Sequence, residues 1–373
     1  MAEFTLLTNP RVDRQGTYPV AFDDILSARE GTRARTDIAR WKGYAPTPLR
    51  DLPDMARSLG IGQLLYKDEG SRFELASFKA LGGALAVERL AARHGRTMTV
   101  TCATDGNHGR AVAWGAARAG CRAVIYVHEG VSEGRAAAIR RFGAEVRREG
   151  RTYDDSVRIC AEVAAREGWQ IVSDTSWPGY TEVPKIVMQG YAVLAMEALE
   201  AGARPTHIFL QGGVGGMAAG VLSWFWQQQG ADRPIAVVVE PDRAACLLAS
   251  VRAGRLETVG GALDTVMAGL ACGEPSALAW EVLSAGADAF MEIPDTAAVD
   301  TMKALAAHRV VGGESGVAGL AGLRLVAADA EARRALRLDS TSRVLCFGTE
   351  GATDPDVYTH LVGRTPAAVA AGA

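Results

Sequence analysis

Apolar runs of strand length alternate with amphipathic stretches of helical period along most of this 373-residue chain. The first clear pair is a strand at 63–70 and a helix at 79–94, and the alternation then continues from residue 97 to residue 176. The second half repeats the pattern, with strands at 206–211 and 234–240 and a late strand from residue 342. Strands that alternate with helices in this way predict βαβ units and an α/β fold with largely parallel sheets.

Three regions of the chain lack this alternation. Residues 1–60 have an irregular pattern with short helices, and residues 242–340 are predicted to be mostly helical. The Ala/Gly-rich tail after Thr365 is expected to be disordered, because it offers little apolar surface to bury. A chain of this length predicts two domains or one large domain.

Composition narrows the function classes. The chain has 40 Lys and Arg against 43 Asp and Glu, so its formal net charge is −3, which argues against nucleic acid as a partner. No basic amphipathic run, signal peptide or long apolar window indicates a membrane, and six scattered cysteines suit the reducing cytoplasm. No metal-ligand spacing is present. Only five residues are lysines, namely Lys42, Lys67, Lys79, Lys185 and Lys303.

A glycine-rich loop, residues 212–216, joins the strand at 206–211 to a following helix. Consecutive backbone N–H groups at a helix N-terminus form an anion cradle, most naturally for a phosphate. Gly213, Gly215 and Ala218 also fit the G-x-G-x-x-A dinucleotide fingerprint, and Glu240 ends the next strand, where a ribose-binding acid would stand. The loop alone therefore leaves open a phosphate site, an NAD site and a merely tight turn.

Three further strand ends carry polar residues. Asp105, Asn107 and His108 follow the strand at 97–104, Thr349 stands in the Gly-rich exit of the late strand, and Lys79 precedes a helix. Because ligands bind at the carboxyl ends of parallel strands, these positions are candidates for one site. Each also has a structural reading: an N-cap for the helix after Asn107, a turn at Thr349 and a surface cation at Lys79.

In their order along the chain, these segments resemble the fold-type-II pyridoxal-phosphate (PLP) enzymes, the group of tryptophan synthase β and threonine dehydratase. The resemblance covers about residues 45–355. Within the group, the stretches ATDGNHGRAVAW, TYDDSVR, SDTSWPGYTEVPKIVMQGY and ESGVAGLAG are most similar to the diaminopropionate ammonia-lyase family. Dehydratases usually have a serine where Asp105 stands, which makes this residue the most informative one.

The resemblance implies an architecture and a cofactor site. It predicts two domains, each with a largely parallel twisted sheet flanked by helices: a large PLP-binding domain from residues 1–83 and 195–373, and a small inserted α/β domain from residues 84–194. Lys79 would carry the Schiff base. The other cofactor-binding residues would be Phe78 near the ring, Asn107 on the 3-oxygen, Gly212, Gly213, Val214, Gly215 and Gly216 around the phosphate, and Thr349 on the pyridine nitrogen.

The resemblance also implies the substrate, D- and L-2,3-diaminopropionate, which would lose its β-amine by α,β-elimination and yield pyruvate and two ammonia. A carboxylate at Asp105 would attract the second amine by about 1–4 kcal/mol at 4 Å. Lys79 would remove the Cα proton from one face and Asp105 from the other, and Asp174 is a plausible second acid. Substrate contacts are expected from Ser77, Thr104, Asp105, His108, Asp174, Glu314 and Ser315.

Three other readings compete with this one. A serine/threonine-type dehydratase or a β-replacement enzyme would share the chemistry, and an NAD-dependent dehydrogenase would use the G-x-G-x-x-A stretch with Glu240. A catalytically silent binding protein would be expected to lose Lys79, which is present. The family is usually homodimeric, so we expect a cytoplasmic homodimer acting on a small amino acid.

Overall fold

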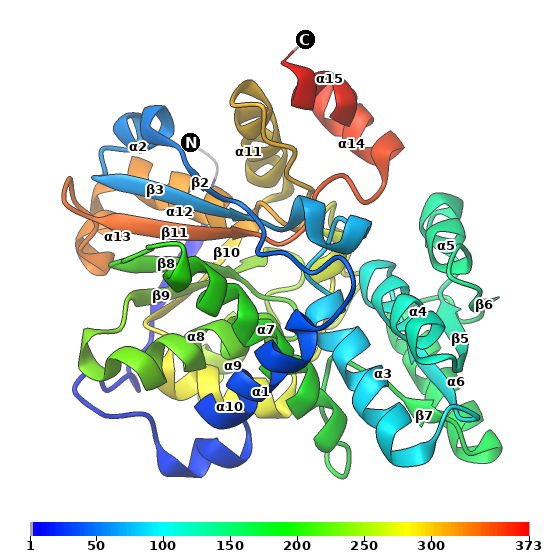
Figure 1. Ribbon diagram of the computed structural model, residues 1–373. Helices are drawn as coiled ribbons and strands as arrows, with labels where there is room; N and C mark the ends of the chain where they lie inside the picture. The colour runs from blue at the N-terminus through cyan, green and yellow to red at the C-terminus, as the bar shows by residue number, and fades with distance from the viewer. Residues whose placement is uncertain (1–2, 373) are drawn as a thin grey trace.

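The computed structural model describes residues 3–372, without the side chain of Asp154, and contains two sheets (Figure 1). The larger sheet has seven strands, of which the five central ones are parallel and the two edge strands antiparallel. In spatial order these are β1 (Thr5–Thr8), β10 (Ala289–Ile293), β9 (Ile235–Pro241), β8 (His207–Gln211), β11 (Arg343–Gly348), β3 (Gln63–Asp68) and β2 (Leu49–Asp51).

The smaller sheet has four strands, all parallel. Their order is β6 (Glu145–Arg148), β5 (Arg122–Val127), β4 (Thr99–Ala103) and β7 (Gln170–Ile171). All four come from the segment that the sequence assigns to an inserted domain, and they lie to one side of the larger sheet in Figure 1. The α/β fold with largely parallel sheets is therefore confirmed.

Helices flank both sheets. Helices α3 and α4 pack together, as do α7 and α8, while α12 packs on strands β8 to β11 of the larger sheet. The helices are α1 (Ala28–Ala39), α2 (Pro53–Ser58), α3 (Ala80–His94), α4 (Asn107–Ala119), α5 (Glu133–Arg140), α6 (Tyr153–Glu167), α7 (Glu182–Glu200), α8 (Gly216–Gln229), α9 (Cys246–Ala253), α10 (Ala277–Gly286), α11 (Asp295–Ala307), α12 (Ala318–Ala328), α13 (Ala330–Leu336), α14 (Pro355–Val362) and α15 (Pro366–Ala371).

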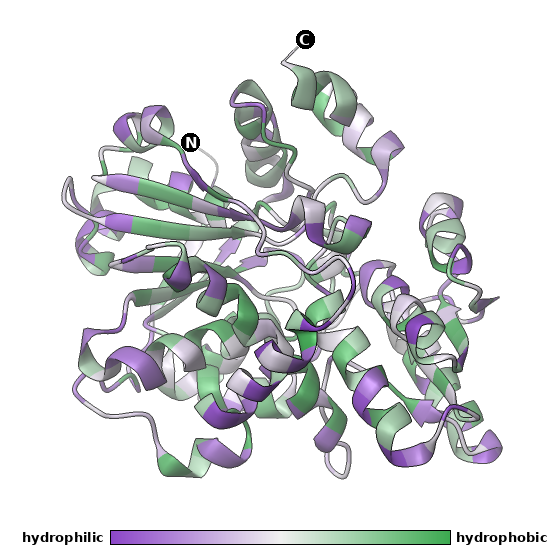
Figure 2. Cartoon of the chain, in the orientation of Figure 1, coloured by the Kyte–Doolittle hydropathy of each residue, from purple (hydrophilic) through white to green (hydrophobic). Residues whose placement is uncertain are grey.

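The larger sheet is buried on both faces. Along β8, Ile208 and Leu210 belong to one apolar cluster, while Phe209 between them belongs to a second cluster on the opposite face. Successive strand residues point to opposite faces, so a sheet covered on both sides reads as a continuous apolar run. Figure 2 shows this in β3 and β11, whose middle residues are hydrophobic and whose ends are hydrophilic.

Residues 242–340 are mostly helical, as predicted, and they also contain one strand, β10, whose apolar run pairs in parallel with β9. The tail after Thr365 is not disordered: it forms α15, where the Thr365 hydroxyl accepts a hydrogen bond from the N–H of Ala368 and Val369 is fully buried. Local composition did not reveal either tertiary contact.

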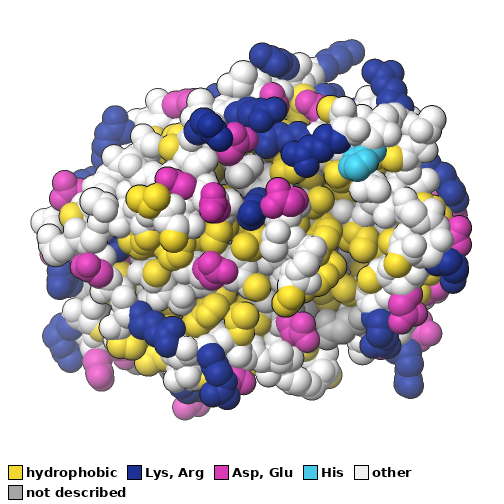
Figure 3. All heavy atoms as spheres, turned by 90° about the horizontal axis from the view of Figure 1, so that it is seen from below, with side chains coloured by type: hydrophobic (Ala, Val, Ile, Leu, Met, Phe, Trp, Pro, Cys, Tyr) yellow, Lys and Arg dark blue, Asp and Glu magenta, His cyan; other side chains and the backbone are white. Residues whose placement is uncertain are grey.

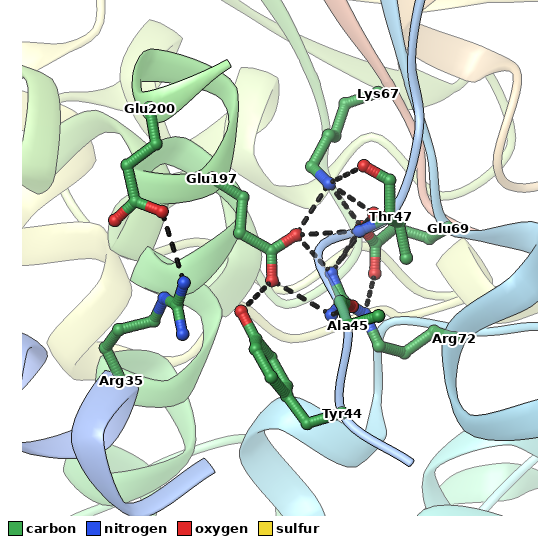
Figure 4. Close-up of polar contacts among 9 residues, drawn as sticks. All are labelled: Arg35, Tyr44, Ala45, Thr47, Lys67, Glu69, Arg72, Glu197 and Glu200. Atoms are coloured by element: carbon green, nitrogen blue, oxygen red, sulfur yellow. Dashed lines mark hydrogen bonds and ion pairs between the residues drawn. The ribbon is translucent and has the colours of Figure 1, made fainter. Parts of the chain in front are cut away.

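A buried ionic cluster, formed by Lys67, Glu69, Arg72 and Glu197, ties β3 and the 3-10 turn after it to α7 (Figure 4). All four side chains are at most 1% exposed. Glu197 Oε2 lies 2.6 Å from Lys67 Nζ and 2.7 Å from Arg72 Nη2, so each charge faces an opposite one. These ion pairs hold the pKa of Glu197 down at about 2 although burial alone would raise it.

This cluster anchors a strained segment that leads to Lys79. The 3-10 turn Glu69–Glu74 contains Arg72, and the backbone φ angles of Phe73, Glu74 and Ala76 are +51°, +60° and +50°. Positive φ is costly for residues other than glycine, and it persists where the surrounding structure fixes the chain. The segment ends at Lys79, which begins α3 as its N-cap.

Candidate active site

A cavity opens where the carboxyl ends of β4, β8 and β11 meet the start of α3. It is lined by residues of five segments: 78–79, 103–108, 211–217, 269–272 and 349–350, together with Arg135, Tyr153, Asp174, Tyr191 and Ser315. Strand ends that lie far apart in the sequence therefore meet at one site, as expected for open parallel sheets.

Lys79 points into this cavity and pairs with Asp174. Its ammonium donates a hydrogen bond to Asp174 Oδ2 and lies 5.3 Å from the centre of the Phe78 ring. Burial alone would lower the pKa of Lys79, but the Asp174 carboxylate raises it well above its ordinary value. The Lys79 ammonium in turn holds the pKa of Asp174 far below its usual range, against the effect of burial. The pair is thus fully charged at neutral pH.

His108 lies beneath this pair as a neutral ring. Its Nε2 lies 2.7 Å from the main-chain oxygen of Val172, which can only accept, so Nε2 carries the proton. Nδ1 is left 3.8 Å from Asp174 Oδ2. Burial lowers the pKa of His108, and the lone pair on Nδ1 therefore faces the Lys79–Asp174 pair without adding a positive charge.

The glycine loop between β8 and α8 forms one wall of the cavity. Gly215 has a φ of +93°, and a Cβ on Gly213 would lie 3.2 Å from Leu270 Cα, so both positions favour glycine. Residues 213–216 line the cavity at the N-terminus of the 14-residue helix α8, where unpaired N–H groups and the helix dipole favour an anion. Gly212 does not reach the cavity, and it packs against Val238, Glu240 and Leu247 instead.

Asp105 projects from the loop after β4 and is held by His128 of the neighbouring strand end. The Gly130 N–H donates to His128 Nδ1 at 3.1 Å, so the ring proton is on Nε2, which donates to Asp105 Oδ1 at 2.9 Å. One carboxylate oxygen is thereby engaged and the other is left for a ligand. Neither Asp105 nor Asn107 caps α4; the Thr104 hydroxyl does, accepting from the N–H of Gly109 at 3.1 Å.

Asn107 and Glu350 connect the two sheets across the cavity. The side-chain amide of Asn107 donates to Glu350 Oε2, and the N–H of Ser315 donates to Glu350 Oε1 at 2.9 Å. Arg135, from α5, donates to Glu314 Oε1 at 2.8 Å. Glu314 is buried behind the wall, where burial and the nearby Glu350 charge raise its pKa to about 7.

Most of the predicted site residues therefore come together. Phe78, Lys79, Thr104, Asp105, Asn107, His108, Asp174, Gly213, Val214, Gly215, Gly216, Ser315 and Thr349 all line the cavity, whereas Ser77, Gly212 and Glu314 lie behind its wall. Other residues at the site were not predicted from the sequence, namely His128, Arg135, Tyr191, Gln211 and Glu350. A polar residue at a strand end was the available signal for His128, Gln211 and Glu350, and nothing local marked Arg135 or Tyr191.

Glu240 is not available to bind a ribose. It is fully buried, and its two oxygens accept hydrogen bonds from the N–H groups of Leu247 and Leu248 at 2.8 and 2.7 Å. Burial raises its pKa to about 8. The Glu240 carboxyl thus pairs with main-chain N–H groups that would otherwise be unpaired at the N-terminus of α9. The acid at the end of β9, which the sequence offered as a ribose-binding residue of an NAD site, therefore has a structural role.

Residues 40–350 match the family of pyridoxal-phosphate-dependent enzymes. The chain belongs to this family, and its cofactor is PLP. The relatives are more specific: the diaminopropionate ammonia-lyase of Escherichia coli K12 is 40% identical over 375 residues, covering 93% of this chain and 94% of its own length. The enzyme of that name from Salmonella typhimurium LT2 is 37% identical, covering 95% of this chain and 96% of its own.

Solved structures give the same picture. The E. coli diaminopropionate ammonia-lyase in complex with an aminoacrylate–PLP azomethine reaction intermediate superposes with a TM-score of 0.90 at 38% identity, over 97% of each chain. The same enzyme in complex with D-serine also gives a TM-score of 0.90, at 37% identity and with the same coverage. Threonine deaminase isoform 2 of Solanum lycopersicum, at 20% identity and a TM-score of 0.76, shares the fold.

The residues present fit PLP. Lys79 supplies an amine inside the cavity, the glycine loop leaves backbone N–H groups facing it at a helix N-terminus, and Thr349 offers a hydroxyl across the site. Among residues 3–372, no group of three His, Cys, Asp or Glu side chains forms a metal site, and no helix there is long and apolar enough to cross a membrane.

Proposed function

We propose that this chain converts D- and L-2,3-diaminopropionate and water to pyruvate and two ammonia by PLP-dependent α,β-elimination. The observation that carries the proposal is the charge of the cavity wall. Among the described side chains, three carboxylates line it, from Asp105, Asp174 and Glu350, against the two cations Lys79 and Arg135, and burial keeps His108 neutral. An acidic wall suits a substrate with a second amine and gives no advantage to a neutral hydroxyl.

The bound cofactor would withdraw electrons from the substrate Cα, which weakens its bond to hydrogen and favours loss of a β-substituent. The chain's own residues would bind and orient the cofactor. Lys79 would hold the cofactor, the loop 213–216 would bind its phosphate, and Phe78 would pack near its ring. Thr349 would contact its pyridine nitrogen, and Asn107 its 3-oxygen once released from Glu350.

An amine and a carboxylate would move the protons. Lys79 would take the Cα proton of one enantiomer, and Asp105 that of the other. Asp174 would hold the Lys79 amine in place, with which it already pairs. His128, with its ring proton fixed toward Asp105, would orient this carboxylate toward the substrate.

A pyruvate-release assay tests the proposal. Purified holoenzyme is expected to release pyruvate from D- and L-diaminopropionate much faster than from D- or L-serine or threonine, since only the former has a second amine for the acidic wall. Ammonia should accumulate at two per pyruvate. Equal or faster turnover of serine would make the chain a dehydratase instead. Transfer of an added thiol or amine to the β-carbon would make it a β-replacement enzyme.

Replacing Asp105 by asparagine should separate the two enantiomers. The amide has nearly the same shape but cannot accept the proton, so kcat for one enantiomer is expected to fall by about 10²–10⁴-fold. The other enantiomer, whose proton goes to Lys79, should lose far less. Asp356→Asn, an exposed acid on α14, is the matched control. Equal losses on both enantiomers would leave Asp105 with a binding role only.

We further propose a cytoplasmic homodimer, with the large and small domains divided at 83/84 and 194/195. The six cysteines, all within the described residues, form no disulfide, which suits a reducing compartment. Figure 3 shows apolar side chains gathered over one face of the molecule, as on surfaces that oligomers cover. Both boundaries fall within helices, 83/84 in α3 and 194/195 in α7, so these two helices would connect the domains.

A further inference from the structure

Gln211 ends strand β8 at the cavity wall, and the chemistry described above gives it no role. Its side chain is 3% exposed. Its amide nitrogen, Nε2, donates to the main-chain oxygen of Gly316 at 2.7 Å and to that of Phe347 at 2.5 Å. The same nitrogen lies 3.1 Å from the hydroxyl oxygen of Thr349.

The two carbonyl oxygens determine which way this amide faces. A flipped amide would place its oxygen against both carbonyls, where it could not form a hydrogen bond. In the observed orientation Oε1 points toward the first turn of α12, where a Cβ on Gly319 would lie 3.1 Å from it. Oε1 has no hydrogen-bond partner among the described residues. Only the hydrogen bonds that Nε2 donates therefore fix the orientation of the amide.

This orientation restricts the Thr349 hydroxyl. An amide nitrogen carries two hydrogens and does not accept hydrogen bonds. The Thr349 oxygen therefore shares one of the hydrogens that Gln211 donates to the two carbonyls, and the Thr349 hydroxyl cannot donate to Gln211. The hydroxyl proton must then point elsewhere. Thr349 lines the cavity, and no other hydrogen bond of its hydroxyl is formed among the described residues. The free direction for the proton is therefore into the cavity.

We propose that Gln211 is a positioning residue that makes the Thr349 hydroxyl a hydrogen-bond donor toward the ring nitrogen of PLP. The inference rests on the proposed function only in that it concerns the same cofactor site. A hydroxyl can otherwise rotate and either donate or accept. Without Gln211 the carbonyls of Gly316 and Phe347 would lose their donor and compete for the Thr349 proton. Gln211 thus keeps the ring nitrogen paired with a donor and free of a proton of its own.

A double-mutant cycle tests this role. Gln211→Met keeps the length of the side chain and removes its donor, and Thr349→Val removes the hydroxyl. Gln211→Met alone is expected to shift the visible absorption band of the holoenzyme and to raise the PLP dissociation constant about 3- to 10-fold. In the Thr349→Val background the same change should have no further effect on either, because Gln211 acts through that hydroxyl. Gln189→Met, a buried amide on α7, is the matched control.

Gln211→Asn repeats the cycle if the methionine variant fails to fold, since the shorter side chain keeps the amide and moves its nitrogen away from the Thr349 hydroxyl. Losses that add fully in the double variant, or an unshifted absorption band, would overturn the proposal. A different result would contradict the proposed substrate without affecting the proposal for Gln211. A wild type that binds PLP and shows the coupling, yet releases no pyruvate from diaminopropionate, would contradict the proposed reaction and leave the role of Gln211 intact.

Discussion

Lys79→Ala is expected to abolish turnover, with kcat reduced by about 10³-fold or more. Among residues 3–372, Lys79 is the one amine in the cavity wall. No arginine can replace it, because a guanidinium stays protonated and forms no covalent bond to the cofactor. The variant should also lose the absorbance of lysine-bound PLP, and borohydride should no longer fix the cofactor to the chain. The measurements are pyruvate release, the absorption spectrum, and mass spectrometry after reduction.

Two control variants separate the amine from its charge. Lys79→Arg keeps a cation beside Asp174, so it should fold like the wild type and yet be as inactive as Lys79→Ala. Lys185→Ala removes a half-buried lysine on α7 that pairs with the exposed Glu182, and it should leave both the spectrum and kcat unchanged. Substantial activity in Lys79→Arg would show that the lysine acts through its charge.

Glu197→Gln is expected to destabilise the protein by about 3–5 kcal/mol, because it leaves Lys67 and Arg72 with only one buried carboxylate between them. The change conserves shape, so the loss reports on charge. Glu200→Gln on the same helix is the matched control: Glu200 is 58% exposed and pairs with Arg35 (Figure 4), so its loss should cost under about 1 kcal/mol. Urea unfolding midpoints of the three proteins give the comparison.

The pH dependence of this difference has a defined sign. Ion pairing holds the pKa of Glu197 near 2 in the folded protein, below its ordinary value of 4.5. The folded state therefore favours the charged form, and the stabilisation is fully present above about pH 4.5 and is lost as the pH falls toward 2. Wild type and Glu197→Gln should differ most at neutral pH and converge in acid. A difference that is independent of pH would show that packing, not charge, accounts for the cost.

The general fold and the location of the site were predictable from the sequence. The strand–helix alternation depends on local residue patterns, and parallel strands bring their carboxyl ends to one edge whatever the details of packing. Asp105 and Thr349 follow strands and Lys79 precedes a helix, all of which the sequence pattern predicts. Their position in one cavity then follows from the rule that parallel strands bring their carboxyl ends to one edge.

Contacts between distant side chains were not predictable in the same way. Glu240 occupied the position of a ribose-binding acid, and only the placement of α9 shows that it caps a helix. Lys67 and Glu197 are 130 residues apart, and neither sequence context marks them as partners. The role we propose for Gln211 depends on two main-chain oxygens from other segments, which no residue pattern encodes.

The order of strands in the larger sheet has a consequence for synthesis of the chain. β3 has β11 as its parallel neighbour, and β1 pairs with β10. Strands that are translated early therefore cannot pair until a late part of the chain has been translated. The smaller sheet, in contrast, uses only residues 99–171. On the ribosome, all four of its strands exist long before the larger sheet can close. Until β11 emerges, β3 has only the short edge strand β2 beside it, and chaperones would meet the chain in this half-paired state.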